Sequence, residues 1–487
     1  MPAVAEAKKQ NEGLPKSRLI GLFLGPLLLV LTLLLPAPEG MNNTAWAAAG
    51  LMLLMATWWS TEAIPIPATA LLPIVLVPAL GLGSVKEATA PYANPIIFLF
   101  LGGFTLGLAM QRWNLHRRIA LLTLRSVGEK PKRQIAGFMI ATAFLSMWVS
   151  NTATSIMMLP IGLSVIAMMG SSEPEAQRRY ATALLLAIAY SASIGGIATL
   201  IGTPPNALLA AYLSENQGVS IGFAQWMLIG VPVTLLMLLL TWWWLTRRDF
   251  GLTSQGDSGA MIGDELAALG SLQKGEKLVA TVFLLTAAAW IFRPLLSDGL
   301  MPWLSDTGIA ISAAVALFLI PVNAKERVFV MDWETAQNIP WGVLLLFGGG
   351  LAMAGVISSS GLAEWIAESL SIAGHLPVIV MIVLVAAVII FLTEVTSNTA
   401  TAAAFLPLLG ALAMSQDLSP LLLTVPAAIA ASCAFMMPVA TPPNAIVFSS
   451  GHMKIQDMIH AGFALNLLGV VVVTLTSYLL LGLVFSL

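Results

Sequence analysis

Two short polar runs interrupt apolar stretches of this chain, and both contain residue types that bind small ligands through hydrogen bonds. The first, Ser150-Asn151-Thr152, lies inside FLSMWVSNTATSIMMLP, and the second, Ser397-Asn398-Thr399, lies inside FLTEVTSNTATAAAFLP. Each run supplies side-chain donors and acceptors and a residue that can cap a following helix. Hydrogen-bonding groups in the middle of an apolar stretch need partners, so both runs are candidate binding sites.

A second pair of motifs has the same character. Thr-Pro-Pro-Asn occurs at 203–206 and again at 441–444. Proline lacks an N–H and disfavours helix in the residue before it, so each Pro-Pro pair predicts an unwound segment inside its helix. Helix N-termini at such breaks attract anions, and freed carbonyl and hydroxyl oxygens can coordinate a small cation.

The composition indicates that these motifs belong to a membrane protein. Of the 487 residues, 58% are hydrophobic and 9% are charged, whereas soluble proteins have about 25% charged residues. The chain is therefore predicted to be a polytopic protein of the lipid bilayer, and we expect no nucleic-acid partner. The single cysteine, Cys433, excludes an intrachain disulfide framework and a thiolate metal site. Because no protease-like Ser/His pair, paired transmembrane aspartates or metal motif is present, we expect no enzyme.

The apolar segments predict an all-α protein. A crossing needs about 20 apolar residues, and about eleven segments fit this length. They lie near 18–36, 45–60, 65–83, 94–111, 180–212, 222–246, 277–296, 306–322, 341–358, 420–449 and 461–486. Two further stretches, about 134–169 and 376–414, are too long for one helix, and Ser-Asn-Thr splits each of them. We therefore predict about eleven transmembrane helices plus two re-entrant hairpins.

Basic residues predict the orientation. Lys and Arg gather in alternate loops, above all in the loop at 112–133, and such loops face the cytoplasm. This rule places the N-terminus in the cytoplasm and the C-terminus outside, in a plasma membrane (the inner membrane of a bacterium). The first hairpin then enters from the cytoplasm and the second from the exterior.

The two halves of the chain form a repeat. At the offset that separates Ser150 from Ser397, further residues of the first half match residues of the second. The matched residues are Phe144, Leu145, Ala153, Thr154, Leu159 and Pro160, which meet Phe391, Leu392, Ala400, Thr401, Leu406 and Pro407. The Thr-Pro-Pro-Asn motifs follow in the same order. Two copies of opposite topology are typical of an inverted-repeat secondary transporter.

The distribution of charge favours co-transport of cations. No Lys or Arg lies between Gln134 and Gln177, between 180 and 246, or between 376 and 453. An anionic substrate at these motifs would meet no fixed cation, so bound cations are the natural counter-charge. Hydrogen bonds between helices could explain one such motif but explain the repeated set poorly. Glu394, the only carboxylate of the second hairpin, has either a functional or a structural role.

Paired Ser-Asn-Thr motifs followed by Thr-Pro-Pro-Asn motifs, in inverted repeats with re-entrant hairpins, resemble the divalent anion/sodium symporters. This family includes the bacterial and animal sodium–dicarboxylate and citrate cotransporters, and the resemblance covers about 45–487. It implies a homodimer whose transport domain moves like an elevator against a scaffold domain. The implied parts are scaffold at 1–127 and 277–372, transport domain at 128–246 and 373–487, and a cytoplasmic linker at 247–276.

The resemblance also implies the site residues. The first sodium site would use Ser146, Ser150 and Asn151 with a carbonyl near Ala198. The second would use Thr393, Thr396 and Asn398 with the carbonyl of Ala440. The substrate carboxylates would lie between Ser150-Asn151-Thr152 and Ser397-Asn398-Thr399, with Thr199, Thr203, Thr441 and Pro442 nearby.

The expected function is sodium-coupled symport of C4-dicarboxylates such as succinate, fumarate and malate by alternating access. Three alternatives stay open at this point. Within transport, the protein could exchange dicarboxylates without sodium, or carry citrate or sulfate with sodium. As a different class, it could be an anion channel, which would conduct without concentrating its substrate.

Overall fold

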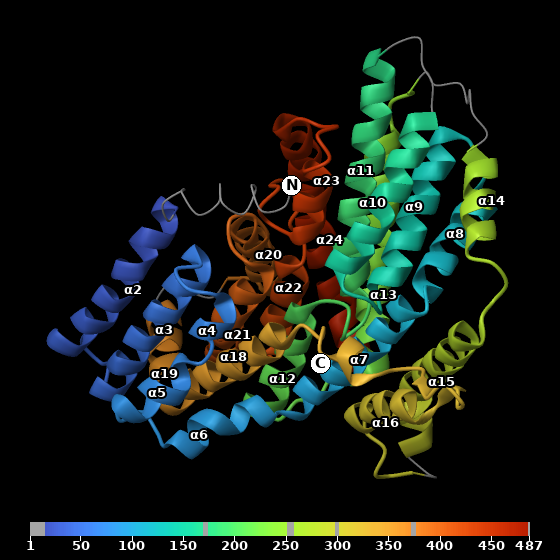
Figure 1. Cartoon of the computed structure of the whole chain (residues 1–487). Coiled ribbons are helices and arrows are strands. Elements are labelled where there is room, and N and C mark those ends of the chain that lie inside the picture. The colour runs from blue at the N-terminus through green and yellow to red at the C-terminus, as the bar shows by residue number, and fades with distance from the viewer. Residues whose placement is uncertain (1–14, 169–173, 251–257, 298–300, 372–375, 486–487) are drawn as a thin grey trace.

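The computed structural model describes residues 15–168, 174–250, 258–297, 301–371 and 376–485. Its elements are helices, apart from one two-stranded antiparallel sheet among the described residues, β1 (Pro321–Asn323) with β2 (Val328–Phe329). Figure 1 shows the helices gathered around a centre that contains α13, α22 and α24. The predicted all-α membrane fold is confirmed, and the small sheet is an addition that the apolar pattern did not indicate.

The first part of the chain runs from α2 to α8. Its elements are α2 (Lys16–Leu34), α3 (Asn43–Thr61), α4 (Ile66–Thr69), α5 (Leu72–Ala79), α6 (Val85–Thr89), the 3-10 turn η1 (Ala90–Ala93), α7 (Pro95–Arg112) and α8 (Leu115–Val127). The segment at 65–83, which the sequence predicted as one span, forms two short helices instead. Pro73 has no N–H to give to the carbonyl four residues earlier, so the helix breaks after Thr69.

The two repeats each form a helical hairpin followed by a broken helix. The first comprises α9 (Pro131–Ser146), α10 (Asn151–Met168), α11 (Pro174–Ile197), α12 (Pro204–Asn216) and α13 (Phe223–Thr246). The second comprises α20 (Val378–Thr393), α21 (Asn398–Ser415), α22 (Leu421–Ala431), α23 (Pro442–Phe448) and α24 (Ile455–Phe485). All four breaks fall at the Ser-Asn-Thr and Thr-Pro-Pro-Asn motifs, as the prolines and capping residues predict.

The region between the repeats contains helices of very different length. It comprises α14 (Ser258–Ala268), α15 (Lys274–Ser297), α16 (Asp306–Leu319), α17 (Trp333–Ala336), α18 (Trp341–Ser359) and α19 (Leu362–Ser371). The predicted span at 306–322 ends at Leu319, where the chain turns into β1.

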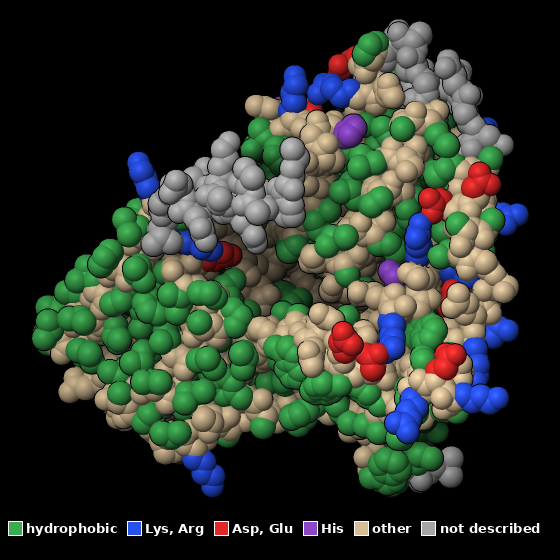
Figure 2. Space-filling model, viewed as in Figure 1, with side chains coloured by type: hydrophobic (Ala, Val, Ile, Leu, Met, Phe, Trp, Pro, Cys, Tyr) green, Lys and Arg blue, Asp and Glu red, His purple; other side chains and the backbone are tan. Residues whose placement is uncertain are grey.

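Length and composition agree with a multi-pass protein. Among the described residues nine helices are long and apolar enough to cross a membrane, and they include the second hairpin arms α10 and α21. Figure 2 shows hydrophobic side chains over the face of α2 to α6, while Lys, Arg, Asp and Glu gather over α8, α14 and α15. The count of eleven crossings and the side of each terminus stay predictions.

The two repeats are interleaved. In α11, 94% of the residues of its apolar 18-residue stretch are buried. This helix packs against α9, α10 and α13 of its own repeat and against α23 of the other. In the same way α12 packs against α21 and α22, and α24 packs against α13. Each hairpin therefore lies beside the broken helix of the other repeat, which brings the four breaks into one region. The division into scaffold and transport domains stays a prediction.

Candidate functional site

The tip of the first hairpin, residues 147–150, is tied to the end of α11. The buried Ser146 hydroxyl lies within hydrogen-bond distance of Asn151 Oδ1 and is 2.7 Å from the carbonyl oxygen of Ala192. The Thr199 hydroxyl donates to the carbonyl of Met147 at 2.6 Å. Ser150 is exposed, and its Oγ accepts the N–H of Ala153, which caps α10. The exposed Ser150 therefore lies next to a pair formed by a buried hydroxyl and a half-buried amide.

The tip of the second hairpin, residues 394–397, repeats this geometry. Thr393 Oγ1 donates to Asn398 Oδ1 at 2.7 Å and lies 3.1 Å from the carbonyl oxygen of Ala431. Thr396, which the resemblance places with them, is bonded inside its own hairpin. Its hydroxyl lies 2.6 Å from Thr401 Oγ1 and donates to the carbonyl of Leu392. The structure thus brings Thr393 together with Asn398 and leaves Thr396 in a local contact.

The first unwound segment, residues 198–203, touches the first hairpin directly. A Cβ on Gly196 would meet Asn151 Oδ1 and the carbonyl oxygen of Gly202, each at 3.0 Å. Glycine is therefore the residue that lets the tip amide reach the backbone of α11. The carbonyl of Ala198, a predicted sodium ligand, is directed toward Gly230 of α13, where a Cβ would lie 2.9 Å from it.

The remaining predicted site residues lie at the same breaks. Ser432 Oγ donates to Thr203 Oγ1 at 3.5 Å and so joins the two unwound segments across the repeats. Thr441 caps α23 by accepting the N–H of Asn444 at 3.3 Å. Ala440 is buried, whereas Pro442 beside it is exposed. Of the two tips, Thr152, Ser397 and Asn398 are half-buried and Thr399 is buried.

Two asparagines that the sequence reasoning left out of the site hold the unwound segments. Asn206 Nδ2 donates to the carbonyl oxygens of Gly196, Ile197 and Thr199 at 2.9 to 3.3 Å. Asn444 Nδ2 donates to the carbonyl oxygens of Ala434 and Met437 at 3.2 and 3.0 Å. Both side chains are fully buried. The available signal was the motif itself, since asparagine ends both Thr-Pro-Pro-Asn sequences.

Glu394 is buried at the second tip and binds the second unwound segment, residues 432–441. Its Oε1 accepts the N–H groups of Phe435 and Met436 at 2.7 and 2.9 Å and the amide of Asn466 at 2.8 Å. Its Oε2 accepts the N–H of Met437 at 2.9 Å. All four donors are uncharged, and three belong to the backbone. Glu394 therefore has the structural role that the sequence left open, and its position is Met147 in the first repeat.

The two tips also differ in what covers them. Trp148 of the first tip stacks on Phe223 and Trp290, with ring centroids 6.1 and 6.4 Å away, and meets Phe283 edge-on at 5.0 Å. The repeat-related residue of the second tip, Val395, is 66% exposed. The first tip is therefore held by an aromatic cluster from α13 and α15, while the second is open.

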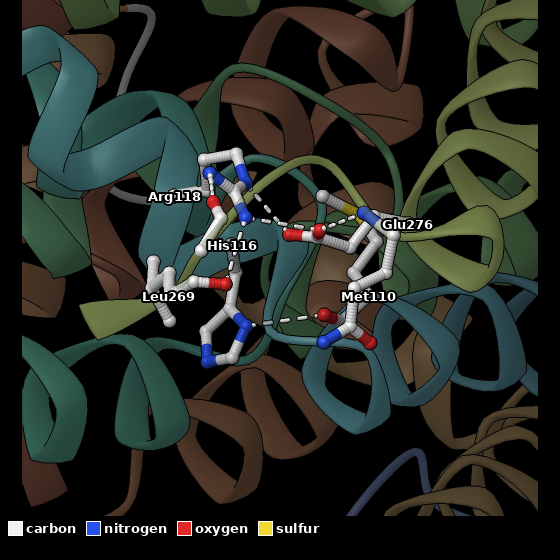
Figure 3. Close-up of polar contacts among 7 residues, drawn as sticks. Met110, His116, Arg118, Leu269 and Glu276 are labelled. Carbon is white, nitrogen blue, oxygen red and sulfur yellow. Dashed lines mark hydrogen bonds and ion pairs between the residues drawn. The ribbon is translucent and has the colours of Figure 1, made fainter. Parts of the chain in front are cut away.

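The first hairpin is anchored from behind by α8, which packs on α9. Figure 3 shows Arg118 of α8 facing Glu276 of α15, with guanidinium-to-carboxylate distances of 2.8 and 3.0 Å. Arg118 also donates to the carbonyls of Leu269 and Gly270. His116 Nδ1 lies 3.1 Å from the carbonyl oxygen of Met110. The contacts of Arg118 fix α8 to the start of α15, and the contact of His116 joins α8 to the end of α7.

The ligands that this site offers are oxygen atoms. In the part of the chain that the structure describes, no ion pair includes a residue of either tip, and no group of three or more His, Cys, Asp or Glu side chains could hold a metal ion. Hydroxyl, amide and carbonyl oxygens suit a hard cation such as sodium, and exposed hydroxyls and helix N-termini suit a carboxylate. The donor set therefore fits the predicted ion and substrate.

Comparisons with solved structures show the same fold. MtrF of Neisseria gonorrhoeae matches with a TM-score of 0.58 at 12% identity, over 96% of this chain and 95% of that one. The YdaH transporter of Alcanivorax borkumensis matches with a TM-score of 0.56 at 14% identity, over 96% and 99% of the two chains. At these identities the similarity concerns the fold alone.

Sequence comparisons give the family. The chain is 46% identical to a protein of Staphylococcus saprophyticus named sodium-dependent dicarboxylate transporter, over 97% of this chain and 93% of the relative. A protein of the same name from Staphylococcus aureus is 42% identical over 98% and 94%. The family model described as the sodium:sulfate symporter transmembrane region matches residues 16–487. The predicted resemblance is confirmed, and the chain belongs to the sodium:sulfate symporter family, whose members are membrane transporters and not enzymes.

Proposed function

We propose that this protein is a sodium-coupled symporter that imports C4-dicarboxylates such as succinate, fumarate and malate. The observation that carries the proposal is the repeated hydroxyl–amide pair behind each hairpin tip, Ser146 with Asn151 and Thr393 with Asn398. The names of the two staphylococcal relatives support sodium-coupled transport of dicarboxylates in general.

The tips bind the anion in this proposal. The two Ser-Asn-Thr runs, which begin at Ser150 and Ser397, donate hydrogen bonds to the two carboxylates. The N-termini of α10 and α21, at Asn151 and Asn398, add a partial positive charge. Thr199, Thr203, Thr441 and Pro442, which lie in or beside the unwound segments, complete the proposed anion site. Since the substrate carries two carboxylates, two facing tips match its chemistry.

Sodium ions bind behind the tips. The first site uses Ser146, Ser150 and Asn151 with the carbonyl near Ala198, and the second uses Thr393, Thr396 and Asn398 with the carbonyl of Ala440. Their charge offsets the dicarboxylate, because no Lys or Arg lies between Gln134 and Gln177 or between 376 and 453. Inward movement of sodium releases about 2.3 kcal/mol per charge for each 100 mV of membrane potential. A cycle that moves more sodium charge than substrate charge is concentrative and electrogenic.

Alternating access proceeds by an elevator movement. The transport domain at 128–246 and 373–487 moves against the scaffold at 1–127 and 277–372, within a homodimer in the plasma membrane. The linker at 247–276 and the N-terminus lie in the cytoplasm, and the C-terminus lies outside.

The test is uptake of labelled succinate into proteoliposomes of the purified protein. An inward sodium gradient is compared with a matched potassium gradient, and unlabelled sulfate and citrate serve as competitors. Accumulation above equilibrium with sodium alone supports the symporter. Uptake that needs internal dicarboxylate and ignores sodium supports an exchanger, and movement of sulfate or citrate in place of succinate changes the substrate. Conductance without accumulation supports a channel.

A further inference from the structure

The asparagines of the two Thr-Pro-Pro-Asn motifs make the same contacts in both repeats. Asn206 donates to the carbonyls of the residues ten and seven positions before it, Gly196 and Thr199. Asn444 also donates to the residues ten and seven positions before it, Ala434 and Met437. Such agreement between two copies of different sequence indicates a shared task.

The amide nitrogen replaces donors that the broken helix has lost. The last carbonyls of a helix have no N–H partner within that helix, and Gly196 and Ile197 end α11. In the buried surroundings of Asn206 an unpaired carbonyl is unfavourable. The two amide hydrogens of Asn206 are shared among three carbonyls here, and the side chain thereby fixes the path of the chain from α11 to α12.

Each asparagine also reaches its hairpin through the segment that it holds. In the first repeat, Thr199 of the unwound segment accepts a bond from Asn206 and donates its hydroxyl to the carbonyl of Met147 at the first tip. In the second repeat, Met437 accepts the bond from Asn444 and donates its own N–H to Glu394 at the second tip. The chain of contacts therefore runs from the asparagine through the unwound backbone to the tip in both cases.

The amide oxygen of each asparagine is the second feature that the two repeats share. Among the described residues, Asn206 Oδ1 and Asn444 Oδ1 are fully buried and have no hydrogen-bond partner. Buried acceptors in proteins are normally paired. A buried acceptor oxygen without a partner is suited to a cation and not to an anion.

We propose that Asn206 and Asn444 are positioning residues for cation binding, each of which holds one unwound segment against one hairpin tip in the shape that receives the ion. The inference rests on the proposed sodium coupling and adds to it two residues outside the predicted ligand sets. It assigns Asn206 to the first cation site and Asn444 to the second.

The experiment measures sodium binding without transport. The purified full-length protein is melted at increasing sodium concentration, at constant ionic strength and without dicarboxylate, and the midpoint of the sodium-dependent rise in Tm is recorded. The variants Asn206→Asp and Asn444→Asp keep the shape of the side chain but present oxygen to the carbonyls. We expect each to raise the sodium midpoint at least tenfold. At saturating sodium, the KM for succinate in proteoliposomes returns toward the wild-type value.

A matched control comes from Asn338, whose exposed amide also donates to two backbone carbonyls, those of Glu334 and Thr335, near the short helix α17. Asn338→Asp should leave the sodium midpoint unchanged. A merely structural role for Asn206 and Asn444 predicts a lower Tm at every sodium concentration with an unaltered midpoint, and that result overturns the inference.

The inference and the proposed function fail in different ways. If sodium does not raise the Tm of the wild-type protein, sodium coupling itself is wrong. If it does and both aspartate variants keep the wild-type midpoint, only the role of the asparagines is wrong. Where an aspartate variant does not fold, Asn206→Ser or Asn444→Ser decides, since serine can replace one of the lost bonds and should raise the midpoint by a smaller factor.

Discussion

Replacement of Glu394 by glutamine tests how the second unwound segment is held. The carboxylate is 3% exposed and accepts four hydrogen bonds, three of them from consecutive backbone N–H groups. Glutamine has nearly the same shape but carries one oxygen and one NH2 group. Whichever way the amide turns, its NH2 group faces at least one N–H donor. The Glu394→Gln protein therefore loses at least one bond and leaves that N–H unpaired.

The size of the effect follows from these bonds. Hydrogen bonds to a charged group contribute about 1.5–3 kcal/mol each and neutral ones about 0.5–1.5 kcal/mol, and an unpaired buried donor costs about 1–3 kcal/mol. Removing a buried charge returns part of its desolvation cost. We therefore expect a net loss of about 2–4 kcal/mol in stability. If the segment must be ordered before a cation binds, each 1.4 kcal/mol of this loss raises the required sodium concentration about tenfold.

Two measurements check this prediction. Thermal melting in potassium gives the loss of stability, and the sodium midpoint of the melting temperature gives the effect on the ion. Met147→Gln is the matched control, because it places the same side chain at the repeat-related position, where the native methionine at the first tip has no carboxylate to lose. Wild-type melting and a wild-type sodium midpoint in Glu394→Gln would refute the assignment of Glu394 as the anchor of this segment.

Three further variants test other contacts of the site and its support. Asn151→Ala removes the amide that pairs with the Ser146 hydroxyl, and it should abolish sodium-driven uptake in proteoliposomes while the melting curve in potassium stays cooperative; normal uptake would remove the basis of the first sodium site. Gly195→Ala places a Cβ about 2.3 Å from the backbone carbonyl of Ala143, so the helices must separate, and we expect a loss of about 1–3 kcal/mol seen as a lower Tm; an unchanged Tm contradicts the tight packing. Arg118→Gln leaves the buried Glu276 without its charged partner and should lower the free energy of unfolding by about 3–5 kcal/mol. The double variant with Glu276→Gln should be more stable than Arg118→Gln alone. Equal melting temperatures of the wild type and Arg118→Gln would show that the pair is dispensable.

The breaks of the fold could be predicted from the sequence because they follow from local chemistry. Pro204-Pro205 and Pro442-Pro443 cannot continue a helix, and each Ser-Asn-Thr run supplies a cap. The structure places all four breaks at these residues. The structure also brings together Ser146 with Asn151 and Thr393 with Asn398, which the family resemblance implied for the two sodium sites.

Other features depend on contacts between distant segments, which a single sequence does not reveal. The hydroxyl of Thr396 has a partner inside its own hairpin, Thr401, and the choice between this partner and an ion is a matter of side-chain direction. Asn206 and Asn444 appear in the motif, but their bonds to carbonyls seven to ten residues earlier exist only once the helix has unwound. The role of Glu394 depends on Asn466 of α24, which lies far along the chain.

The charges at the four breaks explain why the transported anion needs cations as partners. The N-termini of α10, α12, α21 and α23 each provide at most about half a positive charge, and this effect fades within the first turn. A dicarboxylate brings two negative charges, and the buried carboxylate of Glu394 adds a fixed one at the second tip. Because the sequence has no Lys or Arg between Gln134 and Gln177 or between 376 and 453, the helix ends alone leave a negative excess. Two sodium charges are enough to offset that excess, so binding of the anion should become weak when sodium is withdrawn, more strongly at the second tip than at the first.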